Sequence, residues 1–130
     1  MPIRPVKDLV AEAKTQIRTL SVEETLARQQ AGDVLLVDIR DPRELHREGR
    51  IPGAFHAPRG MLEFWVDPAS PYHKPELATD KMLVLFCASA WRSALSVRAL
   101  QEMGVENIAE IGGGFTAWRN AGASIDKDED

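Results

Sequence analysis

The chain of 130 residues contains a single cysteine, Cys87, which excludes an internal disulfide bond. It also lacks the features of exported or membrane proteins, because charges and prolines interrupt residues 1–14 and no apolar run is long enough to cross a bilayer. A net charge of −4 disfavours nucleic acid or an anionic membrane as the main partner. We therefore expect a cytoplasmic protein with a reduced thiol and with neither nucleic acid nor a membrane as partner.

The remaining sequence alternates between short apolar runs and segments with helical spacing. Continuous apolar runs at residues 34–37 and 82–86 predict strands that are covered on both faces. Shorter strands are expected at residues 54–57 and 107–111. Helices are predicted over residues 6–17, 22–31, 42–48, 61–66, 93–103 and 115–120. This alternation is typical of an α/β domain with a mostly parallel central sheet and helices on both faces.

We expect one domain between two flanking segments. Residues 1–20 are predicted to be an N-terminal helical extension, residues 21–124 the domain, and residues 125–130 an acidic tail that frays. Residues 67–81 contain three prolines and predict a long surface loop. The apolar stripe of the first helix allows either packing on the domain or a homodimer through this helix, and the sequence leaves both open.

Cys87 stands where the apolar run 82–86 ends, and with Arg92 it forms the pattern C-x4-R before a predicted helix. A strand end, a tight turn and a helix start aim backbone N–H groups at one point, where they stabilise an anion. Such surroundings lower the pKa of a thiol from its free value of about 8.5 and favour the reactive thiolate. The Arg92 guanidinium adds donors for oxyanions. A lone cysteine is also often an inert core residue, an alternative that the turn, Arg92 and the helix start make weaker.

Other predicted strands also end in polar or glycine residues, at 38–40, 58–59 and 112. The carboxyl ends of parallel strands lie at one edge of a sheet, where binding sites form, so these segments are expected near Cys87. The three histidines, His46, His56 and His73, have no metal-ligand spacing with Cys87. We therefore expect neither a metal nor a cofactor.

Four motifs occur in the order typical of one family. They are V-D-I-R-D-P-R-E-L at residues 37–45, G-R-I-P-G-A at 49–54, C-A-S-A-W-R-S at 87–93 and G-G-F-T-A-W at 113–118. On these motifs the chain resembles the single-domain type of the rhodanese family over residues 21–122. The resemblance implies a rhodanese-like α/β fold and a thiosulfate sulfurtransferase activity.

In that chemistry the Cys87 thiolate attacks the outer sulfur of thiosulfate, sulfite leaves, and cyanide or a thiol accepts the sulfur from the Cys87 persulfide. Arg59 follows the short strand 54–57 and is expected to bind the thiosulfate oxygens, since two positive groups suit a dianion. A solvated arginine or a surface ion pair is the alternative at this position. Asp38 and Arg40 are expected to support the loop as an ion pair rather than to react. The loop residues implied to bind substrate are Ala88, Ser89, Ala90, Trp91 and Arg92.

The loop also distinguishes this chain from its relatives. The phosphatase branch of the fold has C-x5-R, one residue longer, which gives a wider cradle for phosphate. Ala90 stands where many family members have glycine, and alanine costs about 1 kcal/mol if the position requires a positive φ.

A non-enzymatic sulfur carrier or a protein-interaction module, with Trp91 contacting the partner, is the alternative function. A phosphatase or arsenate reductase is a more distant one, and the natural sulfur donor and acceptor stay open.

Overall fold

The computed structural model describes residues 2–127 and shows an α/β fold around a five-stranded sheet whose strand pairs are all parallel. The strands are β1 Thr19–Leu20, β2 Val34–Asp38, β3 Phe55–His56, β4 Met82–Phe86 and β5 Ile108–Ile111. Their order in the sheet is β1-β5-β4-β2-β3, so the strand that precedes Cys87 lies at the centre. The predicted α/β class with a parallel sheet is confirmed.

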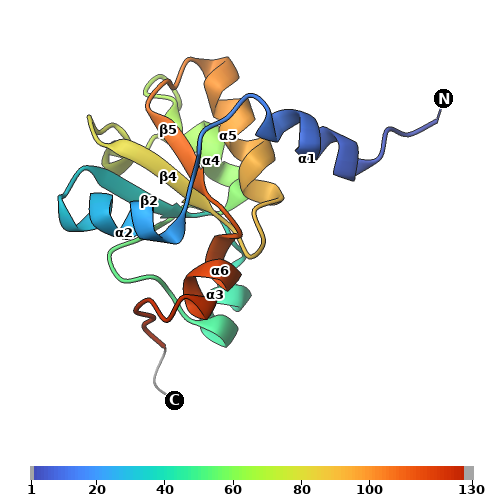
Figure 1. The fold of residues 1–130 in the computed structure, drawn as a ribbon. Coiled ribbons are helices and arrows are strands. Elements are labelled where there is room, and N and C mark those ends of the chain that lie inside the picture. Colours follow the sequence, from blue (N-terminus) through green and yellow to red (C-terminus); the bar gives the residue numbers. More distant parts are fainter. Residues whose placement is uncertain (1, 128–130) are drawn as a thin grey trace.

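Helices cover both faces of the sheet (Figure 1). Val22, Phe115 and Trp118 place α2 and α6 in a core cluster on one face. Leu62 and Val97 place α4 and α5 in the cluster on the opposite face, which also contains Cys87. The α-helices are α1 Val6–Lys14, α2 Val22–Gln30, α3 Pro42–Glu48, α4 Leu62–Val66, α5 Arg92–Met103 and α6 Gly114–Asn120, with 3-10 turns η1 Arg59–Met61 and η2 Pro75–Leu77.

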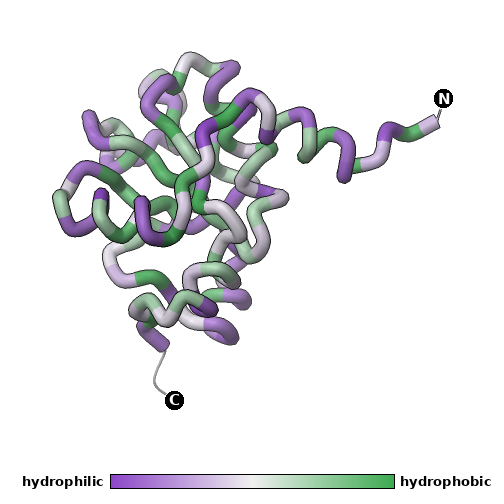
Figure 2. The backbone as a smooth tube through the Cα atoms, in the orientation of Figure 1, coloured by the Kyte–Doolittle hydropathy of each residue, from purple (hydrophilic) through white to green (hydrophobic). Residues whose placement is uncertain are grey.

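The two central strands are apolar at every position except Asp38, the last residue of β2, because helices cover both of their sides. Every residue of β4 is buried, and so is every residue of β2 except the partly buried Leu35. Figure 2 shows this as hydrophobic tube segments at the centre of the molecule, with hydrophilic segments mostly around the outside. Burial on two faces explains why these strands lack the alternation of a half-exposed strand.

Two helices begin where the sequence predicts a start, with the capping contacts that the residue types imply. The Ser21 side chain accepts a hydrogen bond from the Glu24 amide at 3.0 Å, and the Glu24 carboxylate accepts one from the Ser21 amide at 3.1 Å. Asp41 and Glu44 form the same reciprocal pair at the start of α3, with Pro42 in the first turn. These bonds satisfy amides that would otherwise lack partners in the first turn.

The segments outside the central domain differ from expectation. The sequence predicts a helix to residue 17, but α1 ends at Lys14, and Thr19–Leu20 form the edge strand β1 beside β5. The sequence also predicts a frayed tail from residue 125, but Asp126 pairs with Arg50 through two backbone hydrogen bonds of 2.8 Å. The rest of that predicted tail, residues 128–130, lies outside the described residues.

Helix α1 packs beside α5 rather than on the sheet, as Figure 1 shows. Val10 and Ala13 are buried in a small cluster with Ala94 of α5, while Val6 and Leu9 are exposed. The packing joins the N-terminal segment to the helix that follows Cys87. A homodimer through α1 stays a prediction.

Candidate active site

Cys87 follows the last residue of β4 and begins the turn that leads into α5. Only 1% of its surface is exposed. Its carbonyl accepts a hydrogen bond from the Phe115 amide at 2.8 Å, and the Ala88 carbonyl accepts one from the Thr116 amide at 3.0 Å. The start of α6 therefore fixes the first residues of the loop from behind.

The thiol of Cys87 contacts the first turn of α5 through Ser93. The Ser93 amide donates to Sγ at 3.4 Å, and the Ser93 hydroxyl oxygen lies 3.7 Å from Sγ. Burial raises the pKa of the thiol, but hydrogen bonds from the Ser93 amide and hydroxyl and the Ser89 amide, with the charge of Arg92, together hold that pKa below its ordinary value. The start of α5 has no side-chain cap, so its amides are free to face the sulfur.

The loop adopts an unusual backbone conformation at Ala90. Its φ is +67°, and it is the only non-glycine residue between 2 and 127 with a positive φ. The residue is also buried, so its methyl group has fixed neighbours. Alanine in this region costs about 1–2 kcal/mol relative to right-handed backbone, which means that the loop is strained at this position.

Arg92 points its guanidinium at α3. Its two terminal nitrogens donate to the Glu44 carboxylate at 2.7 and 2.9 Å. The hydrogen bond from Arg92 lowers the pKa of Glu44, and the same bond raises the pKa of Arg92. Direct contact between Arg92 and a substrate stays a prediction.

Asp38 and Arg40 form a buried ion pair at the carboxyl end of β2. Arg40 donates to both carboxylate oxygens at 2.9 and 2.7 Å and to the Gly49 carbonyl at 2.8 Å. Its guanidinium also lies 4.1 Å from the centre of the Phe115 ring, on the helix that holds the Cys87 carbonyl. The pair is thus placed to brace the back of the loop.

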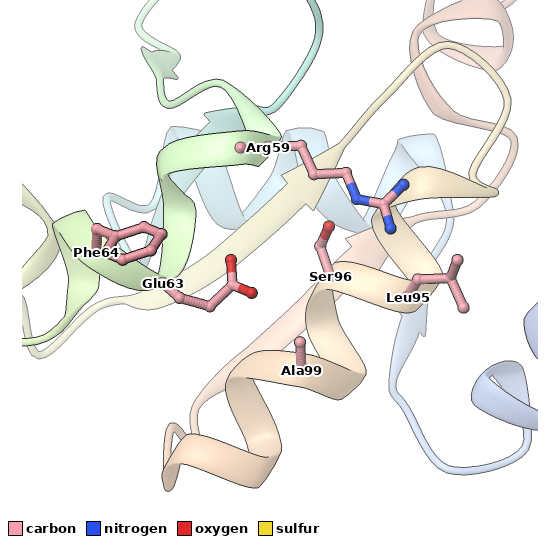
Figure 3. Close-up of a pocket in the computed structure, with 7 residues that line it drawn as sticks. Arg59, Glu63, Phe64, Leu95, Ser96 and Ala99 are labelled. Carbon is pink, nitrogen blue, oxygen red and sulfur yellow. The ribbon is translucent and has the colours of Figure 1, made fainter.

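Arg59 lines a pocket of about 290 Å³ between η1, α4 and α5. Figure 3 shows its guanidinium reaching toward the first turns of α5, above Ser96 and Leu95, while Glu63 points into the same space from α4. The Ser96 hydroxyl is the one buried side-chain polar atom without a partner in the part of the chain that the structure describes. Cys87 does not line this pocket, so Arg59 as a ligand for substrate stays a prediction.

The remaining residues that the sequence analysis named have separate contacts. Trp91 is 46% exposed on the loop, as expected for a residue at the rim. His56 contacts the Arg40 carbonyl at 2.7 Å, and His73 contacts the Trp65 carbonyl at 2.9 Å.

Within residues 2–127 no cluster of His, Cys, Asp and Glu side chains could hold a metal ion. No helix in that range has the length and hydrophobicity to span a membrane.

Three polar residues that the sequence analysis did not select also belong to the site. Ser93 contacts Cys87, Glu44 holds Arg92, and Glu110 of β5 accepts a hydrogen bond of 2.6 Å from the Ser93 hydroxyl. Glu110 had a signal in the sequence, because a carboxylate inside the apolar strand 108–111 requires a buried partner. The sequence could not show which residues supply it.

Comparison with known proteins decides the family. The profile of the rhodanese-like domain matches residues 21–121. The chain belongs to the rhodanese-like domain family. A sulfurtransferase of Allochromatium vinosum is 33% identical over 93 residues, covering 72% of this chain and 78% of that protein.

Two solved structures support the same fold over nearly the whole chain. A Rhodopseudomonas palustris protein of unknown function, described as a possible tyrosine phosphatase, is 49% identical with a TM-score of 0.90, and the match covers 97% of this chain and 99% of that one. The polysulfide-sulfur transferase homodimer of Wolinella succinogenes is 30% identical with a TM-score of 0.71, covering 95% and 88%. This rhodanese-like domain therefore has relatives that support a sulfurtransferase-type role.

Proposed function

We propose that this rhodanese-like protein transfers a sulfane sulfur from thiosulfate, or a similar donor, through a persulfide on Cys87 to cyanide or a thiol. The observation that carries the proposal is the Ser93 amide, which donates to Sγ of the single cysteine at 3.4 Å, together with a thiol pKa below its ordinary value. A thiolate is the nucleophile that this chemistry requires.

The first half-reaction breaks the sulfur–sulfur bond of thiosulfate. The Cys87 thiolate forms a bond to the outer sulfur, and the electron pair of the broken bond leaves with sulfite. The product is a persulfide whose terminal sulfur carries the negative charge. The amides of Ser89 and Ser93, which already act on Sγ, would stabilise this charge as an oxyanion hole stabilises an oxygen.

The second half-reaction restores the thiolate. Cyanide or a thiolate acceptor attacks the terminal sulfur, and the bonding electrons return to Cys87 Sγ. Because only 1% of Cys87 is exposed, both donor and acceptor need the loop at residues 88–91 to open. We expect opening to involve release of Arg92 from Glu44, which would free its guanidinium for the sulfite group. Arg59, which lines the pocket beside the first turns of α5, is the second cation that we expect to bind the donor.

The relative described as a possible tyrosine phosphatase makes phosphoryl transfer the competing function. The loop of this chain argues against it, since only four residues separate Cys87 from Arg92 and the phosphatase branch has five. A non-enzymatic sulfur carrier would load Cys87 in the same way but would pass sulfur only to a protein partner.

Thiocyanate formation from thiosulfate and cyanide tests the proposal, with wild-type protein and Cys87→Ser compared at equal concentration. We expect product with wild type and none above background with Cys87→Ser. Absence of thiocyanate with wild type, or product from Cys87→Ser, would show that the proposed enzyme activity is wrong. Hydrolysis of a phenyl phosphate by wild type, abolished in Cys87→Ser, would instead support the phosphatase.

A further inference from the structure

A fully buried carboxylate lies one hydrogen bond from the residue that contacts Cys87. Glu110 on β5 is 0% exposed. Its Oε1 accepts from the Ser93 hydroxyl at 2.6 Å, and its Oε2 accepts from the Lys14 ammonium and the Thr19 hydroxyl, both at 3.0 Å. A buried carboxylate is stable only when its charge is compensated, and Lys14 is the single cation that contacts it within residues 2–127.

Ser93 connects this carboxylate to the sulfur. In the thiol form the Cys87 S–H group faces the Ser93 oxygen, whose own hydrogen is donated to Glu110. In the thiolate form both the sulfur and the carboxylate are acceptors, and Ser93 has one hydroxyl hydrogen for the two of them. Whatever binds the other oxygen of Glu110 therefore affects how well Ser93 can stabilise the thiolate.

Lys14 is held at this carboxylate by the packing of its helix. It is the last residue of α1, and its side chain is 37% exposed. Val10 and Ala13 of the same helix are buried against Ala94, next to Ser93 on α5. The family match begins only at residue 21, so both Lys14 and Thr19 lie in the segment that precedes it.

We propose that Lys14 is a positioning residue for the Cys87 nucleophile and acts on it through Glu110 and Ser93. The proposal rests on the proposed role of Cys87 in sulfur transfer. Lys14 offsets the negative charge of the Glu110 carboxylate. It also weakens the hydrogen bond that the same carboxylate accepts from the Ser93 hydroxyl. Both effects favour the thiolate, because less negative potential reaches the sulfur and the Ser93 hydroxyl can turn toward it.

Several other charged groups surround the thiol and would remain in place in a Lys14 variant. On α5 Arg92 adds positive charge, which Glu44 of α3 balances. On β2 the Asp38–Arg40 pair is internally neutral. A change in Cys87 ionisation after substitution of Lys14 would therefore report on the path through Glu110.

Titration of the thiolate by its ultraviolet absorbance tests this path without requiring sulfur transfer. The chain has one cysteine, so subtraction of the Cys87→Ser titration leaves the signal of Cys87 alone. In Lys14→Met we expect the pKa of the thiol to rise by about half a unit or more, roughly a threefold change in its ionisation constant. Lys14→Arg should restore the wild-type value. Lys7→Met removes an exposed charge from the same helix and should titrate as wild type.

The route through Glu110 is tested by combining substitutions. Adding Glu110→Gln, or Ser93→Ala if the glutamine variant does not fold, should abolish the effect of Lys14→Met. Equal titrations of Lys14→Met and Lys7→Met would overturn the proposal, as would a Lys14 effect that survives both second substitutions. If wild type makes thiocyanate while all titrations agree, only the Lys14 inference fails. If the titrations differ and wild type transfers no sulfur, the proposed function fails instead.

Discussion

Gly114, the first residue of α6, has no room for a side chain against the Cys87 loop. Its φ is +63°, and a Cβ built there would lie 2.5 Å from the Cys87 carbonyl oxygen and 2.8 Å from that of Ala88. Both neighbours are backbone atoms that accept hydrogen bonds from α6, so neither can rotate away. Gly114→Ala must therefore move the loop or the helix.

The loss of folding stability expected for Gly114→Ala has two parts. Alanine in the left-handed region costs about 1–2 kcal/mol. Loosening the two hydrogen bonds that α6 donates to the Cys87 and Ala88 carbonyls adds about 1 kcal/mol each. Gly122 provides the matched control, because its φ is +78° but nothing lies within 4 Å of its built Cβ. Gly122→Ala should therefore show the conformational cost alone.

Urea unfolding should show Gly114→Ala to be about 2 kcal/mol less stable than Gly122→Ala. Displacement of the first loop residues should also lower the thiocyanate-forming rate by about tenfold or more, while Gly122→Ala keeps the wild-type rate. If both variants have equal stability and equal activity, α6 does not fix the loop as we describe.

Three further substitutions test the loop and its support. Ala90→Gly removes the side-chain strain at a positive φ, so the rate of sulfur transfer should stay within about tenfold of wild type. Tenfold corresponds to about 1.4 kcal/mol in the barrier, and a larger loss of rate would contradict our interpretation of the strained loop. Ser93→Ala removes a hydroxyl whose hydrogen bond lowers the pKa of Cys87, so the rate of sulfur transfer should rise at a higher pH than in wild type. An unchanged pH–rate profile would show that the Ser93 hydroxyl does not stabilise the thiolate. Asp38→Asn leaves Arg40 buried without a carboxylate and should cost about 3–5 kcal/mol in urea unfolding, and wild-type stability would show that the pair does not brace the domain.

The sequence was sufficient for the fold and for placing Cys87 in a turn between a strand and a helix, because both depend on local patterns. Continuous apolar runs identify the central strands, and the C-x4-R loop between strand and helix identifies Cys87. The position of Ala90 in the positive-φ region also follows the expectation from the missing glycine.

The surroundings of Cys87 depend on contacts between distant segments, and local patterns do not reveal these. Lys14 meets Glu110 only because β1 adds to the sheet beside β5 and α1 packs on α5. Strand β1 contains two residues, which is too short for a recognisable alternation. Glu44 looks like an ordinary first-turn glutamate of α3, and its second role with Arg92 depends on how α3 faces α5.

The mass of the intact protein after exposure to thiosulfate tests the central claim most directly. The wild-type protein should gain the mass of one sulfur atom and lose it again when cyanide is added. The mass of the Cys87→Ser variant should not change at either step. A wild-type protein that stays unmodified under conditions in which its thiol is ionised would contradict the account.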